Sequence, residues 1–554
     1  MNELINVKIL NSDLPESLTI SKGSTLLSIL PDELKKQYYI CLVNGRAREL
    51  SFKISFDATL EYVGLNNIEA GKAYEASLRY VMAMAFYNLF KDVKIRFSYN
   101  VSRSIFCQVI SNNLKIDKGI VDKIKAKMDE IIKLDLPIER VTVSWDEAKK
   151  IYEEFKMEDK MEILEYRPEK VVHLYHCGSY YNYMHSYMVP STGYLQNYRL
   201  RLYAPGIIIQ YPRYEMGGII PAFEEAPVYG KTLKAAYEWA KLVDSQTIYK
   251  INHHISGKNT NEFIQMCETK HNNMLAELGE RIKNDIENIR LIAIAGPSSS
   301  GKTTFSNRLR IELMSRGINP VMISIDDYYL DRDKIEPNEN GEIDLEDINT
   351  LDVELFNQHM YALINGEEVQ LPHFDFVLAK RVPGKKIKVA PNCPIIIEGI
   401  HALNELMSSS IPKHQKFKIF ISPQIQINID NHSPMSTTDL RLIRRIVRDK
   451  QFRNAPATKT LSMWPSVRRG EFKWIYPNQE QSDYVFNSEL TYELCVLKKY
   501  ALPLLKEIEP DNEYFIVANR LLKYLKYFKS IDEAAIPCNS LIREFIGGSC
   551  FNVC

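Results

Sequence analysis

The 554-residue sequence has no net charge, no long apolar run and no Cys-x-x-Cys pair. Lys and Arg total 70, as do Asp and Glu, which argues against a nucleic acid or membrane held by overall charge. No run approaches the roughly 20 apolar residues of a transmembrane helix, and the first residues lack the apolar core of a signal peptide. Nine scattered cysteines are typical of a reduced chain. We therefore expect a cytoplasmic protein with no membrane partner.

One segment, from Gly296 to Thr304, has the residues and spacing of a phosphate-binding loop. The apolar run 291–295 before it predicts a buried strand, and the helical spacing of 305–314 after it predicts a helix. In that context glycines let successive backbone N–H groups face phosphate oxygens, and the helix N-terminus adds positive charge. A Ser/Gly turn that binds nothing is the alternative. The residues predicted to bind ATP are Gly296, Pro297, Ser298, Ser299, Ser300, Gly301, Lys302, Thr303 and Thr304.

Beyond the loop, apolar runs alternate with stretches of helical spacing, which predicts an α/β fold with a doubly wound parallel sheet. The predicted strands are 320–325, 394–397, 416–421 and 483–487. Ligands bind at the carboxyl edge of such a sheet. Asp326 and Asp327 directly follow the first of these strands, and Glu398 follows the second. We therefore expect these three carboxylates at the ligand-binding edge.

An ordered series of motifs in residues 290–490 resembles the phosphoribulokinase/uridine kinase family of P-loop kinases. After the loop come Asp326-Asp-Tyr-Tyr, Gly341-Glu-Ile-Asp344, Leu371-Pro-His-Phe-Asp-Phe376, Ile396-Ile-Glu-Gly-Ile-His401 and Thr438-Asp-Leu-Arg-Leu-Ile-Arg-Arg445. The resemblance implies an ATP- and Mg²⁺-dependent kinase that phosphorylates a hydroxyl of a nucleoside or a related sugar-containing metabolite. A kinase of a sugar phosphate or of another ribosyl compound is the alternative enzyme.

The resemblance also implies roles for single residues. Lys302 would reach the β- and γ-phosphates, and Asp326 would be the general base that takes the proton of the acceptor hydroxyl. Mg²⁺ would be held by Thr303 and, through water, by Glu398 and Asp327. The residues expected to bind the acceptor are Asp344, Phe374, Asp375 and Arg381.

Four arginines recur at helical spacing in the last motif. Arg441, Arg444, Arg445 and Arg448 stand at i, i+3, i+4 and i+7 and so share one helix face. Holding four guanidinium groups together without an anion is costly, which predicts a polyphosphate partner. In the resembling family this helix belongs to a lid over ATP, so Arg444 and Arg445 are expected in catalysis and Arg441 and Arg448 in ATP binding. A solvated basic face is the alternative.

Two features depart from the uridine kinases. Where they place a histidine that reads the pyrimidine base, this chain has Ala379, so we expect a site that reads the ribose more strictly than the base. Residues 456–482 also differ from the short uridine kinases, and they include two tryptophans and several cations. This segment either rebuilds the acceptor pocket or forms a packed surface loop.

The front half resembles two parts of threonyl-tRNA synthetases. Residues 1–65 alternate like the TGS domain, a ubiquitin-like β-grasp module, with Asn44-Gly45 as a hairpin turn. Residues 66–250 resemble the α+β domain that edits mischarged tRNA. In place of the histidines and cysteine of the editing site stand Tyr80, Met84, Met184 and Met188. Phenol and thioether groups cannot act as those ligands or bases, so we expect no editing chemistry.

We therefore divide the chain into four parts. They are a TGS-like domain (1–65), an editing-like domain (66–250), a connector helix (251–288) and a kinase domain with a helical C-terminal part (289–554). The TGS-like part carries seven basic and eight acidic side chains, which disfavours RNA binding through charge. An RNA- or ribosome-associated ATP-binding regulator is the alternative from another functional class, and a homo-oligomer is left open.

Overall fold

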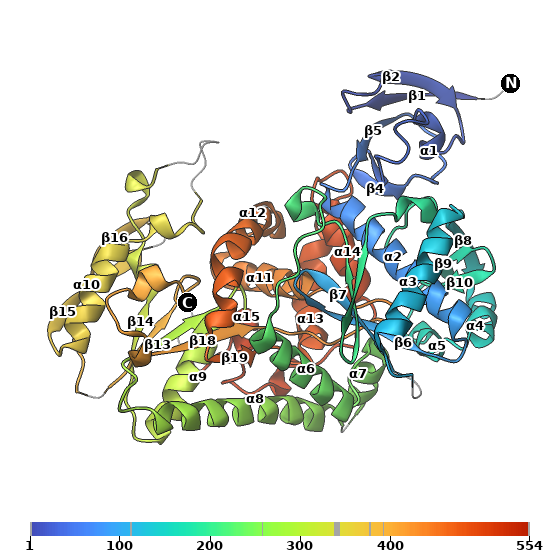
Figure 1. The fold of residues 1–554 in the computed structure, drawn as a ribbon. Coiled ribbons are helices and arrows are strands. Elements are labelled where there is room, and N and C mark those ends of the chain that lie inside the picture. The colour runs from blue at the N-terminus through green and yellow to red at the C-terminus, as the bar shows by residue number, and fades with distance from the viewer. Residues whose placement is uncertain are drawn as a thin grey trace.

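The computed structural model describes residues 3–110, 114–257, 259–336, 344–375, 378–391 and 393–551. A five-stranded parallel sheet in the C-terminal half confirms the predicted α/β class. In Figure 1 this sheet lies at the left, and a second five-stranded sheet, formed by the N-terminal residues, stands out at the upper right. The layers between them are formed by helices and by two antiparallel sheets.

The N-terminal sheet has the strand order β2-β1-β5-β3-β4, in which β1 and β5 are parallel and the other neighbours antiparallel. Its elements are β1 (Leu4–Ile9), β2 (Ser17–Ser21), α1 (Leu26–Ile29), β3 (Ile40–Val43), β4 (Arg46–Glu49) and β5 (Ala58–Val63). Asn44 and Gly45 join β3 to β4 with φ angles of 48° and 71°. Positive φ at both positions is the geometry of a type I′ turn, so the predicted hairpin is confirmed.

Helix α2 (Ile68–Leu89) is the centre of the next layer, where Tyr74 and Tyr80 are fully buried. Asn67 caps it, because its side chain accepts a hydrogen bond from the Glu69 amide. Around α2 pack two antiparallel sheets, with strand orders β10-β9-β8 and β11-β12-β7-β6. The elements are β6 (Ile95–Val101), β7 (Ser104–Val109), α3 (Lys118–Lys133), β8 (Glu139–Ser144), α4 (Trp145–Glu154), α5 (Glu158–Leu164), β9 (Val171–Cys177), β10 (Tyr180–Asn182), β11 (Arg199–Tyr203) and β12 (Gly206–Gln210).

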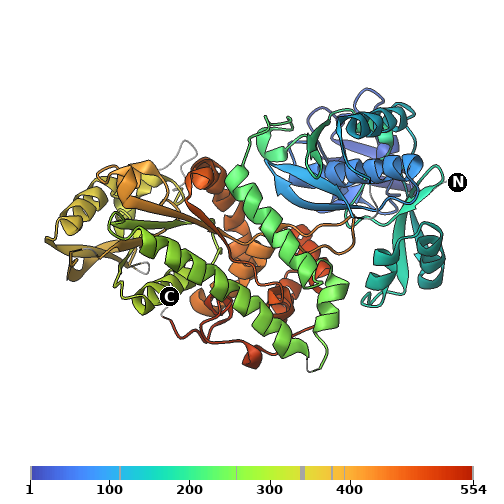
Figure 2. The same ribbon diagram turned by 60° about the horizontal axis from the view of Figure 1, so that its bottom comes forward.

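Three helices lead from this layer to the parallel sheet, namely α6 (Pro227–Leu242), α7 (Ile248–His254) and α8 (Asn259–Asn284). Helix α8 is the predicted connector, and it ends at Asn284 rather than at residue 288. It runs along the lower edge of the molecule in Figure 1. Figure 2 brings that edge forward and shows α6 beside α8, where the Lys270 ammonium lies 4.0 Å from the centre of a Trp239 ring.

The parallel sheet has the order β14-β17-β13-β18-β19. Its strands are β13 (Leu291–Ala295), β14 (Val321–Ser324), β17 (Ile395–Glu398), β18 (Lys416–Ser422) and β19 (Tyr484–Asn487). Ile292 and Ile294 of β13 share a core with α8 and α9 (Lys302–Ser315), whereas Leu291 and Ala293 share one with α10 (Val353–Ile364) on the other face. Helices therefore cover both faces, and the predicted doubly wound sheet is confirmed.

The remaining elements are a separate two-stranded sheet and the helices of the C-terminal part. They are the hairpin β15 (Glu368–Asp375) and β16 (Lys380–Lys388) and the helices α11 (Thr437–Arg453), α12 (Ala457–Gly470), α13 (Glu493–Lys506), α14 (Phe515–Leu525) and α15 (Arg543–Ile546). Helix α11 is a core element, since Leu440, Ile443 and Ile446 are fully buried among residues of α13 and α15.

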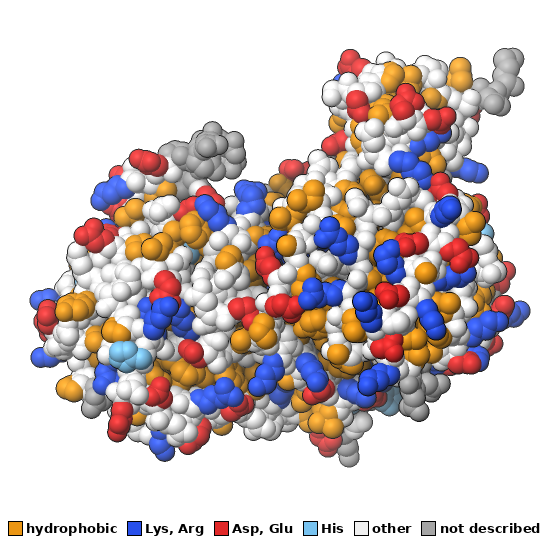
Figure 3. All heavy atoms as spheres, viewed as in Figure 1, with side chains coloured by type: hydrophobic (Ala, Val, Ile, Leu, Met, Phe, Trp, Pro, Cys, Tyr) orange, Lys and Arg blue, Asp and Glu red, His pale blue; other side chains and the backbone are white. Residues whose placement is uncertain are grey.

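The surface carries charges of both signs. On the face shown in Figure 3, Lys and Arg side chains alternate with Asp and Glu over both halves. This mixture matches the equal totals of basic and acidic residues in the sequence. Within the described ranges, no helix is both long and apolar enough to cross a membrane.

Candidate active site

The phosphate-binding loop connects β13 to α9. Gly301 has a φ of 90° and stands immediately before Lys302, the first residue of α9, so the helix N-terminus opens into the loop. Gly296 permits close packing, because a Cβ there would lie 2.0 Å from the carbonyl oxygen of Ile421. The Lys302 ammonium lies over the loop and donates to the Gly296 carbonyl oxygen at 3.0 Å. The loop thus has the backbone shape that phosphate binding requires.

Three buried hydroxyls of this loop have no protein partner. Within the part of the chain that the structure describes, the side-chain oxygens of Ser299, Ser300 and Thr304 are buried and make no hydrogen bond. Leaving such a group unpaired costs about 1–3 kcal/mol, so buried hydroxyls normally find partners. Phosphate oxygens are acceptors for all three, and the residues present therefore fit the triphosphate of ATP.

Two carboxylates end neighbouring strands beside the loop. Ser324, the last residue of β14, pairs with Glu398 at the end of β17, and Asp326 follows in a 3₁₀ turn. Burial raises the pKa of Asp326, the nearby Lys302 ammonium opposes that shift and the Asp327 carboxylate adds to it. Burial also raises the pKa of Glu398 to about 7, and the negative charge of Asp326 adds to the effect. Lys302 acts on the pKa of both carboxylates, so the expected pair shares one site with Lys302.

The residues at this edge also fit Mg²⁺. Among the described residues, no group of three or more His, Cys, Asp or Glu is arranged to bind a metal by itself. Mg²⁺ usually takes one or two protein oxygens and completes its shell with phosphates and waters. Thr303, in the first turn of α9, and Glu398, at the end of β17, supply oxygens of the required kind.

Asp327 contacts two residues of the β15–β16 hairpin, which the sequence did not predict. Its Oδ1 lies 2.9 Å from Nδ1 of His373 and accepts a hydrogen bond from the Phe374 amide at 3.2 Å. Both partners belong to β15, so Asp327 anchors the hairpin to the end of β14. The predicted role of Asp327 in ordering Mg²⁺ waters stays a prediction.

The other predicted acceptor residues lie on the same hairpin. Phe374 is buried. Asp375 accepts a hydrogen bond from the Leu378 amide at 2.9 Å. Arg381 forms an ion pair with Asp352 at 2.8 Å, and Asp352 also caps the N-terminus of α10. Arg381 is therefore held by a carboxylate of this chain, which the sequence alone did not show.

Residues 456–482 fold as α12 and two short helical turns that follow it. They lie against the segment that carries Asp344: the Ser466 hydroxyl donates to Asp344 Oδ1 at 3.4 Å, and Lys473 binds Asp347 at 2.8 Å. Of the two alternatives for this segment, these contacts favour a wall of the acceptor pocket over a separate surface loop.

Glu346 is a carboxylate of this region that the sequence reasoning missed. Its amide donates to Asp344 Oδ1 at 3.2 Å. Burial raises the pKa of Glu346 to about 7, and the positive charges of Arg445 and Lys302 oppose the shift. The sequence signal that could have identified Glu346 was its position two residues after Asp344. Residues 341–343 of that motif lie outside the described residues.

Two of the four α11 arginines are neutralised inside the protein. Arg441 and Arg444 are fully buried and form ion pairs with the buried carboxylates of Glu471 and Glu493. The prediction that this face needs an external anion is therefore wrong for these two, because carboxylates 30 and 49 residues away in sequence supply the charge. Since α11 is a core helix, the expected placement in a mobile lid is also corrected.

The arginines of α11 also hold the phosphate-binding loop. Arg441 donates to the Ser298 carbonyl oxygen at 3.0 Å, and Arg445 donates to the Ser298 hydroxyl at 3.0 Å. Arg445, Arg448 and Arg453 share one carboxylate, that of Asp449. Three cations for this one anion leave net positive charge near the loop. A nucleotide role for Arg445 and Arg448 stays a prediction.

The counterpart of the editing site in the front half is filled by packed side chains. All four residues that replace the editing groups are buried, namely Tyr80, Met84, Met184 and Met188. The Tyr80 hydroxyl donates to the Tyr180 carbonyl oxygen at 2.8 Å. These side chains are part of one hydrophobic core, which agrees with the predicted loss of editing chemistry without testing it.

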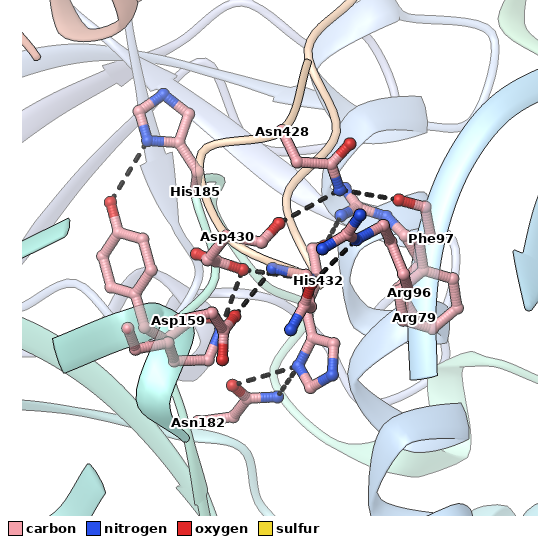
Figure 4. Close-up of polar contacts among 12 residues, drawn as sticks. Arg79, Arg96, Phe97, Asp159, Asn182, His185, Asn428, Asp430 and His432 are labelled. Atoms are coloured by element: carbon pink, nitrogen blue, oxygen red, sulfur yellow. Dashed lines mark hydrogen bonds and ion pairs between the residues drawn. The ribbon is translucent and has the colours of Figure 1, made fainter. Parts of the chain in front are cut away.

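A segment of the C-terminal half, residues 423–436 between β18 and α11, enters this region (Figure 4). Its Asp430 forms an ion pair with Lys160 of α5 at 2.8 Å, and both side chains are at most 1% exposed. His432 Nδ1 lies 2.9 Å from the side-chain nitrogen of Asn182 at the end of β10. The segment thus places polar groups of one half into the interior of the other.

Further hydrogen bonds fix the same segment to the front half. Asn428 donates to the Phe97 carbonyl oxygen at 2.7 Å, and Arg96 donates to the Asn431 side chain at 2.8 Å. The Asn431 amide in turn donates to Asp159 at 2.7 Å. These residues surround the segment from β6 and α5, as Figure 4 shows. The two halves therefore share a polar interior directly before the arginine helix α11.

Comparisons with known proteins agree with both predicted resemblances. Residues 291–494 match the family model described as "Phosphoribulokinase / Uridine kinase family". A uridine kinase of Brevibacillus brevis is 27% identical over 196 residues, which cover 35% of this chain and 83% of that protein. A threonine–tRNA ligase of Halalkalibacterium halodurans is 30% identical over 205 residues of the N-terminal region, which cover 36% of this chain and 31% of the ligase.

A solved structure of a possible uridine kinase from Bacillus stearothermophilus is also similar to part of the chain. The identity is 18%, the TM-score is 0.27, and the likeness covers 38% of this chain and 100% of that one. A putative fructose transport system kinase from a Silicibacter species gives a TM-score of 0.29 at 20% identity, over 38% of this chain and 98% of that one. The chain spans less than a third of the length of the ligase.

Proposed function

We propose, on the premise that residues 291–494 form a domain of the phosphoribulokinase/uridine kinase family, that this chain phosphorylates a hydroxyl of a nucleoside with ATP and Mg²⁺. The observation that carries the proposal is the phosphate-binding loop itself. Among the described residues it combines Lys302 with buried, unpartnered hydroxyls next to Asp326 and Glu398. A loop that served only as a turn would not require a lysine, unpartnered hydroxyls and two carboxylates at one place.

Bound ATP supplies the phosphoryl group, and Mg²⁺ neutralises charge on its phosphates. In this proposal Lys302 and the N–H groups at the start of α9 orient the phosphates. Asp326 takes the proton of the acceptor hydroxyl, and its raised pKa fits that task because a base works best near the operating pH. Thr303 and Glu398 hold the cation, and Arg445 and Arg448 face the transferred charge.

The acceptor is proposed to be bound mainly through its sugar. Asp344 has a second carboxylate oxygen for ribose hydroxyls, and α12 forms the wall beside it. Few side chains can donate a hydrogen bond to the base of the nucleoside. Ala379 has no polar side chain, and the Arg381 guanidinium is paired with Asp352. We therefore expect activity on more than one base and a strong loss when the ribose hydroxyls are removed.

The test is ADP release by the purified full-length protein with ATP and Mg²⁺ across uridine, cytidine, inosine, their deoxy analogues, ribose and ribose phosphates. Ribonucleoside-dependent release over several bases supports the proposal. Release with sugar phosphates alone would favour the alternative sugar-phosphate kinase. If only uridine and cytidine react, another residue reads the base, and the inference from Ala379 is wrong. If several bases react, Ala379→His should narrow the range toward pyrimidines.

A further inference from the structure

The C-terminal tail contacts the phosphate-binding loop, although it lies outside the kinase family segment 291–494. Glu544 Oε2 accepts a hydrogen bond from the backbone N–H of Thr304 at 2.9 Å, across 240 residues of sequence. The side chain of Leu541 covers Gly301, where a Cβ would lie 2.4 Å from a Leu541 methyl carbon. The tail therefore reaches the first turn of α9, where the loop amides converge.

Several contacts fix the backbone of this tail segment. Leu541 and Phe545 are fully buried, and the Arg444 guanidinium lies 5.0 Å from the centre of the Phe545 ring. The Ser540 hydroxyl donates to the buried carboxylate of Glu268. Since these neighbours hold the backbone on both sides of Glu544, the movable part is the Glu544 side chain.

The position of the Glu544 carboxylate conflicts with that of a nucleotide. The N–H groups at the start of the helix after a phosphate-binding loop serve the α- and β-phosphates. The Glu544 carboxylate, which is negatively charged like a phosphate, accepts a hydrogen bond from one of these N–H groups, that of Thr304. It is only 7% exposed, so water and salt screen its charge weakly. The same charge adds to the raised pKa of Glu398, which places Glu544 within electrostatic range of the proposed metal side.

We infer that Glu544 is a built-in competitor of the nucleotide phosphates and sets the nucleotide affinity of the loop. In the free protein it satisfies the Thr304 N–H, and it leaves that N–H when a di- or triphosphate binds. The inference rests on the proposed function, because it assumes that the loop binds a nucleotide. It assigns the tail to the nucleotide site, beyond the segment that the family model matches.

The test compares MgADP binding by the full-length protein, the Glu544→Gln variant and a matched tail variant, Glu533→Gln. The amide introduced by Glu544→Gln keeps an acceptor for the Thr304 N–H but loses the charge. We expect roughly tenfold tighter MgADP binding, the size of one charge-assisted hydrogen bond. Glu533 binds Tyr500 and Lys499 away from the loop, so its variant should bind like the unmodified protein. Adenosine, which has no phosphate, should bind all three equally.

Titration calorimetry gives the affinities, and thermal unfolding confirms that each variant is folded. Equal MgADP affinity of the unmodified protein and Glu544→Gln would overturn this inference alone. Weaker binding by that variant would also overturn it, because the carboxylate would then act on the cation. If neither protein binds MgADP, the proposed function and this inference fail together. Should Glu544→Gln not fold, Glu544→Asp keeps the charge on a shorter chain and is expected to tighten binding by a smaller factor.

Discussion

Buried polar groups are satisfied differently in the phosphate-binding loop and in the interior of the front half. In the loop, within the described residues, the hydroxyls of Ser299, Ser300 and Thr304 are buried without a partner. In the front half, Lys160 and Asn182 are supplied with Asp430 and His432 from another part of the same chain. Unpartnered buried hydroxyls indicate a place where a ligand can bind, whereas buried groups that are paired within the chain indicate an internal contact between its two halves.

The largest effect is expected from Lys302→Ala in the loop. Removing the ammonium takes away charge stabilisation at the β- and γ-phosphates, so turnover should fall by about 10³–10⁵-fold. Steady-state ADP release measures it, with unfolding curves as a check of the fold. Lys234→Ala, an exposed lysine on α6, is the matched control and should change turnover little. Near-normal turnover of Lys302→Ala would mean that this loop is no catalytic site.

Asp326→Asn separates a base from a structural carboxylate. Loss of a general base should lower turnover by about 10²–10⁴-fold with little change in nucleotide affinity. Asp327→Asn should have the smaller effect on turnover, because Asp327 binds His373 and the Phe374 amide. Turnover and MgADP affinity are measured for both variants. A larger loss for Asp327→Asn would exchange the two roles.

Lys160→Met removes the buried ion pair between Lys160 of the front half and Asp430 of the C-terminal half. It leaves Asp430 as an unpaired buried charge, which should lower the free energy of unfolding by about 3–5 kcal/mol. Urea unfolding measures the change. The control is Lys22→Met, which breaks an exposed ion pair with Glu3 and should cost less than about 1 kcal/mol. A similar decrease in the free energy of unfolding for the two variants would show that the Lys160–Asp430 ion pair is not buried in the folded protein.

The pH dependence of the free energy of unfolding tests whether burial raises the pKa of Glu398 in the nucleotide site. Burial raises the pKa of Glu398 to about 7 in the folded protein, so the folded state holds a proton that the unfolded state has released. Stability from this group is therefore present at low pH and lost as the pH rises through about 7. Between about pH 5.5 and about pH 8.5 the loss should be about 2 kcal/mol. Glu398→Gln should remove this part of the pH dependence, and Glu368→Gln, on the exposed hairpin, should not.

The smallest expected effect is no effect. The full-length protein should not hydrolyse mischarged threonyl-tRNA, because the editing groups are replaced by buried Tyr and Met side chains such as Tyr80 and Met188. A deacylation assay with an editing-competent threonyl-tRNA synthetase as positive control measures this. Hydrolysis above the spontaneous rate would show that the front site has kept a catalytic task.

Local features were predictable because neighbouring residues cause them. The five strands of the parallel sheet appear as short apolar runs, and the carboxylates at their ends follow from chain order. Long-range charge pairing was not predictable. Arg441 and Arg444 were predicted to need an external anion, because Glu471 and Glu493 come close to them only after folding. Glu544 had no signal at all, since nothing in its own segment indicates the loop 240 residues earlier.

The entry of residues 423–436 into the front half has a consequence for inheritance. Helix α11 follows a segment whose buried groups are bonded to the front half: Asp430 forms its ion pair with Lys160, and Asn428 donates to the Phe97 carbonyl oxygen. A split of the chain ahead of α8 would put Lys160 on one product and Asp430 on the other, and each would then be a buried charge without its counter-charge. The two products are therefore expected to fold poorly apart and to be inherited as one coding unit.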